Sequence, residues 1–143
     1  MYAEIAPSSA HALHMPSHIF LQLGMWERVV NSNIESYASA VSHTKKLIEQ
    51  GVTNLGTSVV GREDFHSLSW LAYGNLMLGH YDRAQENLDL ALIVVDANPG
   101  NRYAHVGYLN MLARHAVETG DCRNISLGSA AVSYTHLTLP TKA

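Results

Sequence analysis

Three histidines lie close together near the start of the chain, at a spacing suited to metal binding. His11, His14 and His18 are separated by three and four residues in the segment AHALHMPSHIF. If this segment is helical, the spacing places all three imidazoles on one side of the helix. Two histidines at positions i and i+4 can share a divalent transition metal, and zinc is the first expectation for nitrogen ligands.

The same segment lacks the carboxylate of a typical hydrolytic zinc motif. The pair reads His-Met-Pro-Ser-His, whereas zinc proteases carry HExxH, in which the glutamate is the general base. Pro16 also removes the N–H group that would bond to the carbonyl of Ala12, so the helix is expected to kink or to start again there. His11 and His14 could then hydrogen-bond freed carbonyl groups, which is a structural role that competes with metal binding.

The composition indicates one ordinary domain and excludes some partners. The chain has 143 residues, of which 47% are hydrophobic and 15% charged. Its net charge is −3, and Lys45-Lys46 is the only adjacent basic pair, so a nucleic-acid partner is not expected. The sequence contains no run of about 18 apolar residues, so it predicts no membrane-spanning helix. The single Cys122 excludes an internal disulfide and a cysteine-based zinc site.

The elements that would position these histidines are predicted to be helices separated by glycine turns. The segments 23–29 and 78–84 share the pattern Leu-Gly-x-aromatic-acid-Arg-small or branched, and residues 119–122 form a weaker copy. A glycine at each turn supplies the left-handed conformation between antiparallel helices. Helices are expected from Trp26 to about Gln50, from about residue 62, and after Tyr81. The last of these has an apolar stripe of Ala84, Leu88, Ala91, Leu92 and Val95.

This pattern resembles the tetratricopeptide repeat (TPR), in which paired helices carry Gly-x-Tyr-x-x-Ala at the turn and a proline near the end. Those roles fall on Gly79, Tyr81, Ala84, Ala91 and Pro99. The phrase HMPSHIF followed by Leu-Gly-x-Trp resembles an uncharacterised bacterial subgroup of TPR-like proteins. The resemblance implies an all-α solenoid of helical hairpins, present here as a truncated fragment.

The chain also departs from the repeat pattern. The turn glycines are 55 and 41 residues apart, from Gly24 to Gly79 and from Gly79 to Gly120, whereas the family period is 34. In the first repeat, the positions that are usually small or aromatic hold Val29, Asn33 and Ser36.

The resemblance implies a concave groove lined by the first helix of each repeat. It implies a protein- or peptide-binding scaffold without intrinsic catalysis, in which Arg114 could pair with a carboxylate. The alternative is a zinc-binding protein or metal-dependent enzyme that uses His14, His18 and His66, with Glu63 or Asp64 as the base if the fold brings either close. The full set of groove residues is His11, His14, His18, His66, Ser69, Tyr73, Asn110 and Arg114.

The end of the chain is expected to be foreign to the repeats. Residues 132–141, VSYTHLTLPT, resemble one translated reading frame of a sequencing-library adapter, and we interpret 123–143 as a non-native or disordered tail. Residues 1–122 are then a partial set of repeats that lacks its original start. No signal peptide is visible in this fragment, and its compartment and oligomeric state stay open.

Overall fold

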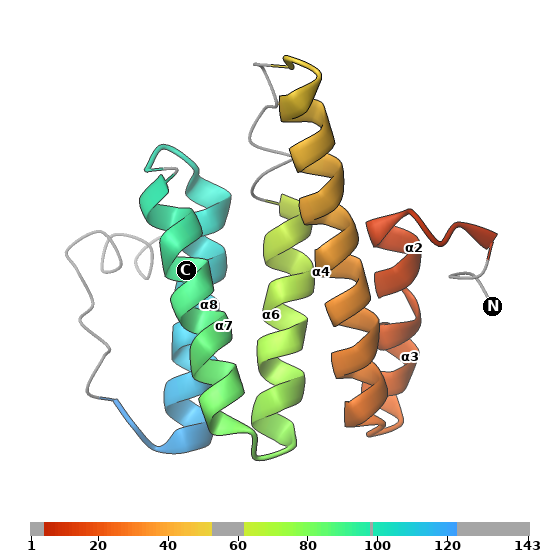
Figure 1. Cartoon of the computed structure of the whole chain (residues 1–143). Helices are drawn as coiled ribbons and strands as arrows, with labels where there is room; N and C mark the ends of the chain where they lie inside the picture. Colours follow the sequence, from red (N-terminus) through yellow and green to blue (C-terminus); the bar gives the residue numbers. More distant parts are fainter. Residues whose placement is uncertain (1–4, 53–61, 98, 123–143) are drawn as a thin grey trace, which may run out of the picture.

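The computed structural model describes residues 5–52, 62–97 and 99–122, and this part of the chain is helical with no strand. The all-α prediction is therefore confirmed for these residues, while the adapter-like tail lies outside them. The helices are α2 (Ala10–His14), α3 (Pro16–Gln22), α4 (Trp26–Glu49), α6 (Arg62–Met77), α7 (Tyr81–Ala97) and α8 (Arg102–Thr119) (Figure 1).

Glycines end three of the helices at the predicted turns. Gly24, Gly79 and Gly120 have φ angles of 67°, 72° and 70°, in the left-handed region that residues with a Cβ rarely adopt. Each follows a helix directly or within two residues, as the repeated Leu-Gly pattern and its weaker copy predict. The turns into α4 and α7 are thus encoded locally.

Pro16 starts a new helix, one of the two outcomes expected for it. Helix α2 ends at His14, and Pro16 is the first residue of α3, where its missing N–H group costs no intrahelical bond. Ser9 caps the start of α2, because its hydroxyl accepts a hydrogen bond from the N–H of Ala12. The short α2 and α3 therefore continue in nearly the same direction (Figure 1).

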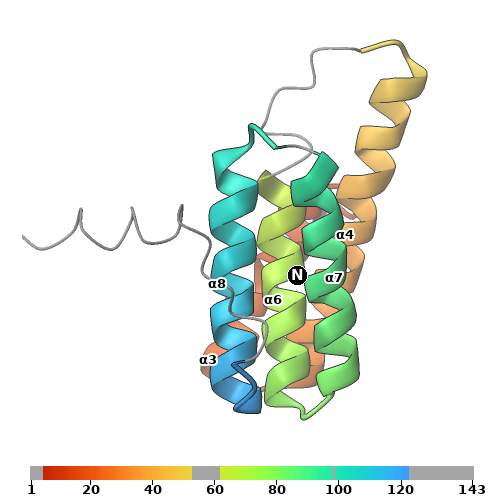
Figure 2. The ribbon, with the colours of Figure 1, turned by 90° about the vertical axis from the view of Figure 1, so that its left-hand side faces the viewer.

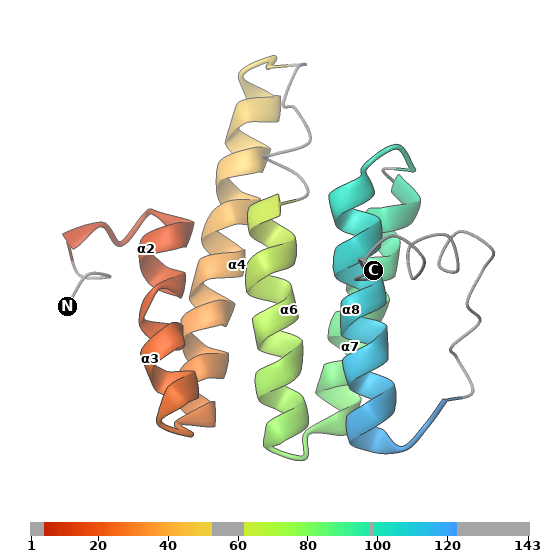
Figure 3. The same ribbon diagram turned by 180° about the vertical axis from the view of Figure 1, so that it is seen from behind.

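Helix α4 packs on α2 and α3 on one side and on α6 on the other, and α6 in turn packs on α7 and α8. Seen from behind, the same neighbours appear in the reverse left-to-right order, from α2 and α3 through α4 and α6 to α7 and α8 (Figure 3). The view turned by 90° shows α6 between α7 and α8, which contact each other (Figure 2). Among the described residues, none of the helices combines the length and apolar character needed to cross a membrane.

The core lies where α6, α7 and α8 meet. Its buried members include Phe65, Leu68, Leu88, Ala91 and Met111. The predicted stripe of α7 is buried at Ala84, Leu88, Ala91 and Val95, but Leu92 is 39% exposed, so its assignment to the stripe is wrong. Leu92 follows Ala91 directly, and a step of one residue turns its side chain about 100° from the buried face.

Candidate metal centre

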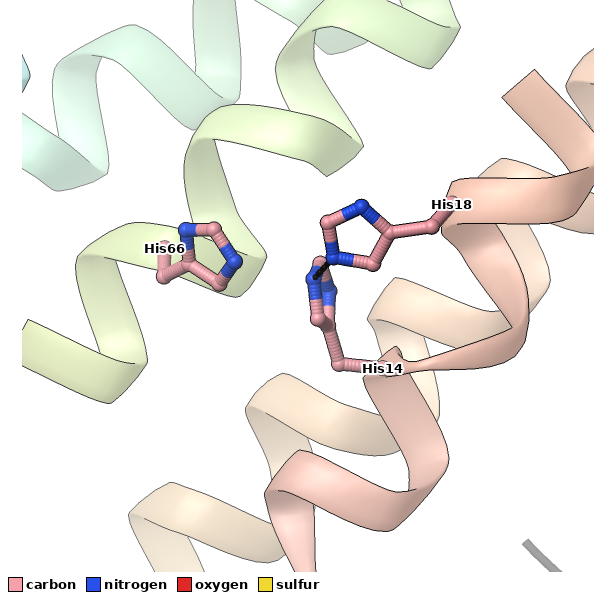
Figure 4. Close-up of side chains that lie close together, drawn as sticks. All are labelled: His14, His18 and His66. Atoms are coloured by element: carbon pink, nitrogen blue, oxygen red, sulfur yellow. Dashed lines mark hydrogen bonds between the residues drawn. The ribbon is translucent and has the colours of Figure 1, made fainter. Parts of the chain in front are cut away.

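Three of the predicted histidines meet between two parts of the fold. His14 ends α2, His18 lies on α3 and His66 lies near the start of α6, and each turns its ring toward the others (Figure 4). One ring nitrogen from each lies within 4.8 Å of the other two. In a tetrahedral site with Zn–N bonds of ~2.0–2.1 Å, ligand nitrogens are about 3.3 Å apart. Modest side-chain rotation would therefore let the three imidazoles share one ion.

His14 is held in a single orientation by Asn33 on α4. Its Nδ1 lies 2.7 Å from Asn33 Oδ1, and the amide nitrogen of Asn33 donates to the carbonyl of Val29 at 2.8 Å. Because that nitrogen must face Val29, the oxygen faces His14, and His14 Nδ1 must carry the proton. His14 Nε2 is then left with its lone pair directed at the cluster. Metal-binding histidines commonly have this arrangement, in which the other ring nitrogen donates to a fixed acceptor.

The surroundings of His14 keep its imidazole neutral. The pKa of His14 is lowered from 6.5 to about 4, chiefly by burial and to a smaller extent by the neighbouring His66, His18 and His11, while the hydrogen bond to Asn33 acts in the opposite direction. Only a neutral imidazole can bind a metal ion. His14 is therefore ready to act as a ligand at neutral pH without first losing a proton.

His18 contacts His14 directly. The two Nε2 atoms are 3.0 Å apart (Figure 4). Since His14 Nε2 has the lone pair, His18 Nε2 donates the proton in the metal-free protein. Metal binding at this nitrogen would move the proton of His18 to its other nitrogen, which changes the tautomer but not the net charge of the ring.

Polar residues of α4 fix the backbone that carries His14. The hydroxyl groups of Ser32, Ser36 and Ser39 donate to the carbonyl groups of Leu13, Ala10 and Ser8, respectively. Ser36 also bonds to Ser67 of α6 at 2.7 Å between the two hydroxyl oxygens. These bonds attach α2 and the residues just before it to α4. The position of His14 at the end of α2 is therefore set by α4.

Trp70 forms an aromatic wall beside the cluster. Its ring centroid lies 5.1 Å from that of His14 and 4.4 Å from that of His18. Trp70 is also one helical turn after His66, with the ring centroids 6.0 Å apart. The indole therefore contacts histidines from both sides of the site, and it limits the directions from which solvent can enter.

The remaining predicted groove residues lie outside the three-histidine cluster. The ring of His11 is 6.5 Å from that of His14, and His11 lines a separate cavity of about 240 Å³ between α2 and α4. The hydroxyl of Ser69 donates to the carbonyl of His66. Tyr73 and Arg114 contact each other, with the guanidinium 5.3 Å from the ring centre, while Asn110 is exposed on α8.

Sequence reasoning missed two residues of the site. Asn33 is visible in the sequence only as a departure from the small or aromatic residues usual at these repeat positions, and that departure is the available signal for a polar role. Trp70 carries no separate signal in the sequence, because an aromatic side chain on a helix is usually a packing residue. Glu63 and Asp64, the candidates for a general base, have side chains outside the described residues.

Comparison of the chain with family models, with curated proteins and with solved structures finds no match. The chemistry of the site therefore has to be inferred from its geometry.

Proposed function

We propose that this protein binds a divalent transition-metal ion, zinc in the first instance, through His14, His18 and His66. The observation that carries the proposal is the convergence of the three ring nitrogens within 4.8 Å. Three imidazoles suit zinc and the neighbouring first-row metals, and they do not suit magnesium or calcium, which prefer oxygen ligands.

The hydrogen bond between His14 and Asn33 supports the same proposal. A buried histidine with a purely structural role would use both ring nitrogens in bonds to fixed protein groups. Here Nδ1 is held by Asn33, while Nε2 faces another histidine whose ring can change tautomer. The arrangement resembles a metal ligand with its supporting acceptor already in place.

Titration of the metal-free protein with Zn²⁺ in a calorimeter tests this proposal. We expect one equivalent to bind to the wild-type chain. His18→Ala and His66→Ala each remove a ligand, so each should weaken binding by more than the 10–100-fold that loss of an outer partner costs. His43→Ala is the matched control, because His43 is exposed on α4 and outside the cluster. Equal affinity in all four proteins would contradict the proposal.

A second candidate function is a TPR-type scaffold that binds a protein or peptide along the α2–α3, α6 and α8 surface. The observation that favours it is the contact of Arg114 on α8 with Tyr73 on α6, since both were predicted to face one groove. The stacked guanidinium is exposed and can bind a carboxylate. Selection of peptides from a random library on the immobilised protein, repeated with Arg114→Gln, tests it. Acidic peptides that bind the wild-type chain should be lost with the variant.

A further inference from the structure

The three-histidine cluster is closed at one end and open at the other. His14 is 1% exposed, His18 is half-buried and His66 is exposed. Trp70 lies closest to His18 and His14, with ring centroids 4.4 Å and 5.1 Å away, and its ring centroid is 6.0 Å from that of the exposed His66. A metal ion held by these nitrogens would therefore face solvent on the His66 side.

The number of protein ligands also indicates a coordination position that is open to solvent. Among the described residues, the group that could hold an ion contains these three histidines and no cysteine, aspartate or glutamate. Structural zinc sites are closed by four protein ligands, whereas catalytic sites combine three protein ligands with a water molecule. Within the described part of the chain, the cluster therefore has the ligand number of a catalytic site.

The charge of the site would favour hydroxide at the remaining position. Neutral imidazoles leave the ion with its full double positive charge, and such an ion lowers the pKa of a bound water to about 7. Hydroxide then forms near neutral pH by loss of a proton to solvent. The glutamate of an HExxH motif, which the segment His14 to His18 lacks, is not needed for that step.

We propose that the zinc-loaded protein hydrolyses small activated esters at the solvent-facing coordination position. This inference rests on the metal site proposed above. The hydroxide oxygen forms a bond to the ester carbonyl carbon, and the carbon–oxygen bond to the leaving group then breaks. The leaving group departs with the bonding electron pair, as a phenolate for an aryl ester. The carboxylic acid product loses its proton to solvent, and a new water molecule binds.

The test uses the full chain loaded with one equivalent of Zn²⁺ and 4-nitrophenyl acetate as the substrate. We expect release of 4-nitrophenolate at least tenfold faster than with the metal-free protein. The metal-free protein is the reference because it measures any direct attack of histidine on the ester. Zinc alone is the second reference. His66→Ala should lose both the bound zinc and the additional rate, whereas the control His43→Ala should keep both.

A second readout reports on the coordination position without using activity. Cobalt replaces zinc in nitrogen sites and has visible absorption bands that depend on its ligands. Added azide should change these bands if the fourth position is exchangeable. If one equivalent of metal binds but azide has no effect and hydrolysis equals that of the metal-free protein, the proposed activity is overturned while the metal site stands. If no metal binds, the metal site itself is overturned.

Discussion

At the scale of the residue, the site depends on the hydrogen bond between His14 and Asn33. Both side chains are buried, with 1% and 0% of their surfaces exposed, so water cannot replace either partner. The bond selects the tautomer that directs His14 Nε2 toward His18 and His66. Asn33 is therefore a positioning residue for the proposed ion.

Asn33→Ala removes the acceptor 2.7 Å from His14 Nδ1 and leaves this buried N–H group with only the more distant hydroxyl oxygen of Ser17, at 3.4 Å. We expect a loss of about 1–3 kcal/mol in the free energy of unfolding, measured by urea denaturation. We also expect the zinc affinity to fall 10–100-fold, measured by calorimetry. Asn110→Ala, which changes an exposed asparagine on α8, is the matched control. A fully folded Asn33→Ala protein with unchanged zinc affinity would contradict the positioning role.

The lowered pKa of His14 predicts a pH dependence of stability in metal-free buffer. Between about pH 4, the folded value, and pH 6.5, the ordinary value, the unfolded chain binds a proton at His14 that the folded chain does not. The free energy of unfolding should therefore rise with pH across this window, with no further gain from His14 above it. Urea denaturation from pH 4.5 to 7.5 checks this. In His14→Gln, the free energy of unfolding should rise less steeply with pH. An unchanged slope would show that other titratable groups cause the pH dependence.

At the scale of the element, the close approach of α6 and α8 depends on a glycine. A Cβ atom on Gly107 would lie 2.7 Å from Cδ1 of Phe65, which is a core residue one position before His66. This contact is shorter than real Cβ atoms tolerate, so either the ring or α8 would have to move. The position of His66 is thus coupled to the packing of α8.

Gly107→Ala is expected to destabilise the protein. Overpacking a filled core costs about 1–3 kcal/mol, and the better helix propensity of alanine returns at most about 1 kcal/mol. Thermal unfolding followed by circular dichroism measures the net effect. Gly100→Ala is the control, because a Cβ there meets nothing within 4 Å. A Gly107→Ala protein as stable as this control would show that Phe65 moves without cost.

At the scale of the whole molecule, the proposed ion would join parts of the fold that have few direct contacts. Helix α4 lies between the α2–α3 segment and most of α6, so α2 and α6 contact each other only sparsely. Ligands from α2, α3 and α6 would link these parts directly. Metal binding should therefore stabilise the native arrangement as a whole.

Zinc at a free concentration of about 100 times its dissociation constant should raise the free energy of unfolding by about 2.7 kcal/mol. Guanidinium denaturation with and without zinc measures the shift, and a chelator should reverse it. His66→Ala, which lacks the ligand from α6, should show a much smaller shift at the same zinc concentration. An equal shift in this variant would place the binding of zinc elsewhere on the chain.

Local sequence determined the helices and their turns, because each depends on nearby residues. The left-handed glycines after α3, α6 and α8, and the restart at Pro16, follow from backbone conformations that few other residues adopt. The i, i+4 spacing of His14 and His18 likewise placed both on one side of a helical segment. That all described elements are helical was predicted for the same reason.

Only the tertiary structure decided which side chains from distant segments meet. The distances from His66 to the first two histidines depend on how α4 packs between helices, and no local pattern specifies that packing. The hydrogen bond between His14 and Asn33, which are 19 residues apart, also depends on the packing of one helix on another. Trp70 is one helical turn after His66, but it meets His14 and His18 only because of the tertiary packing. The spacing of His14 and His18, together with the register of the repeat resemblance that adds His66, thus predicted the candidate ligands, while long-range packing created the candidate site.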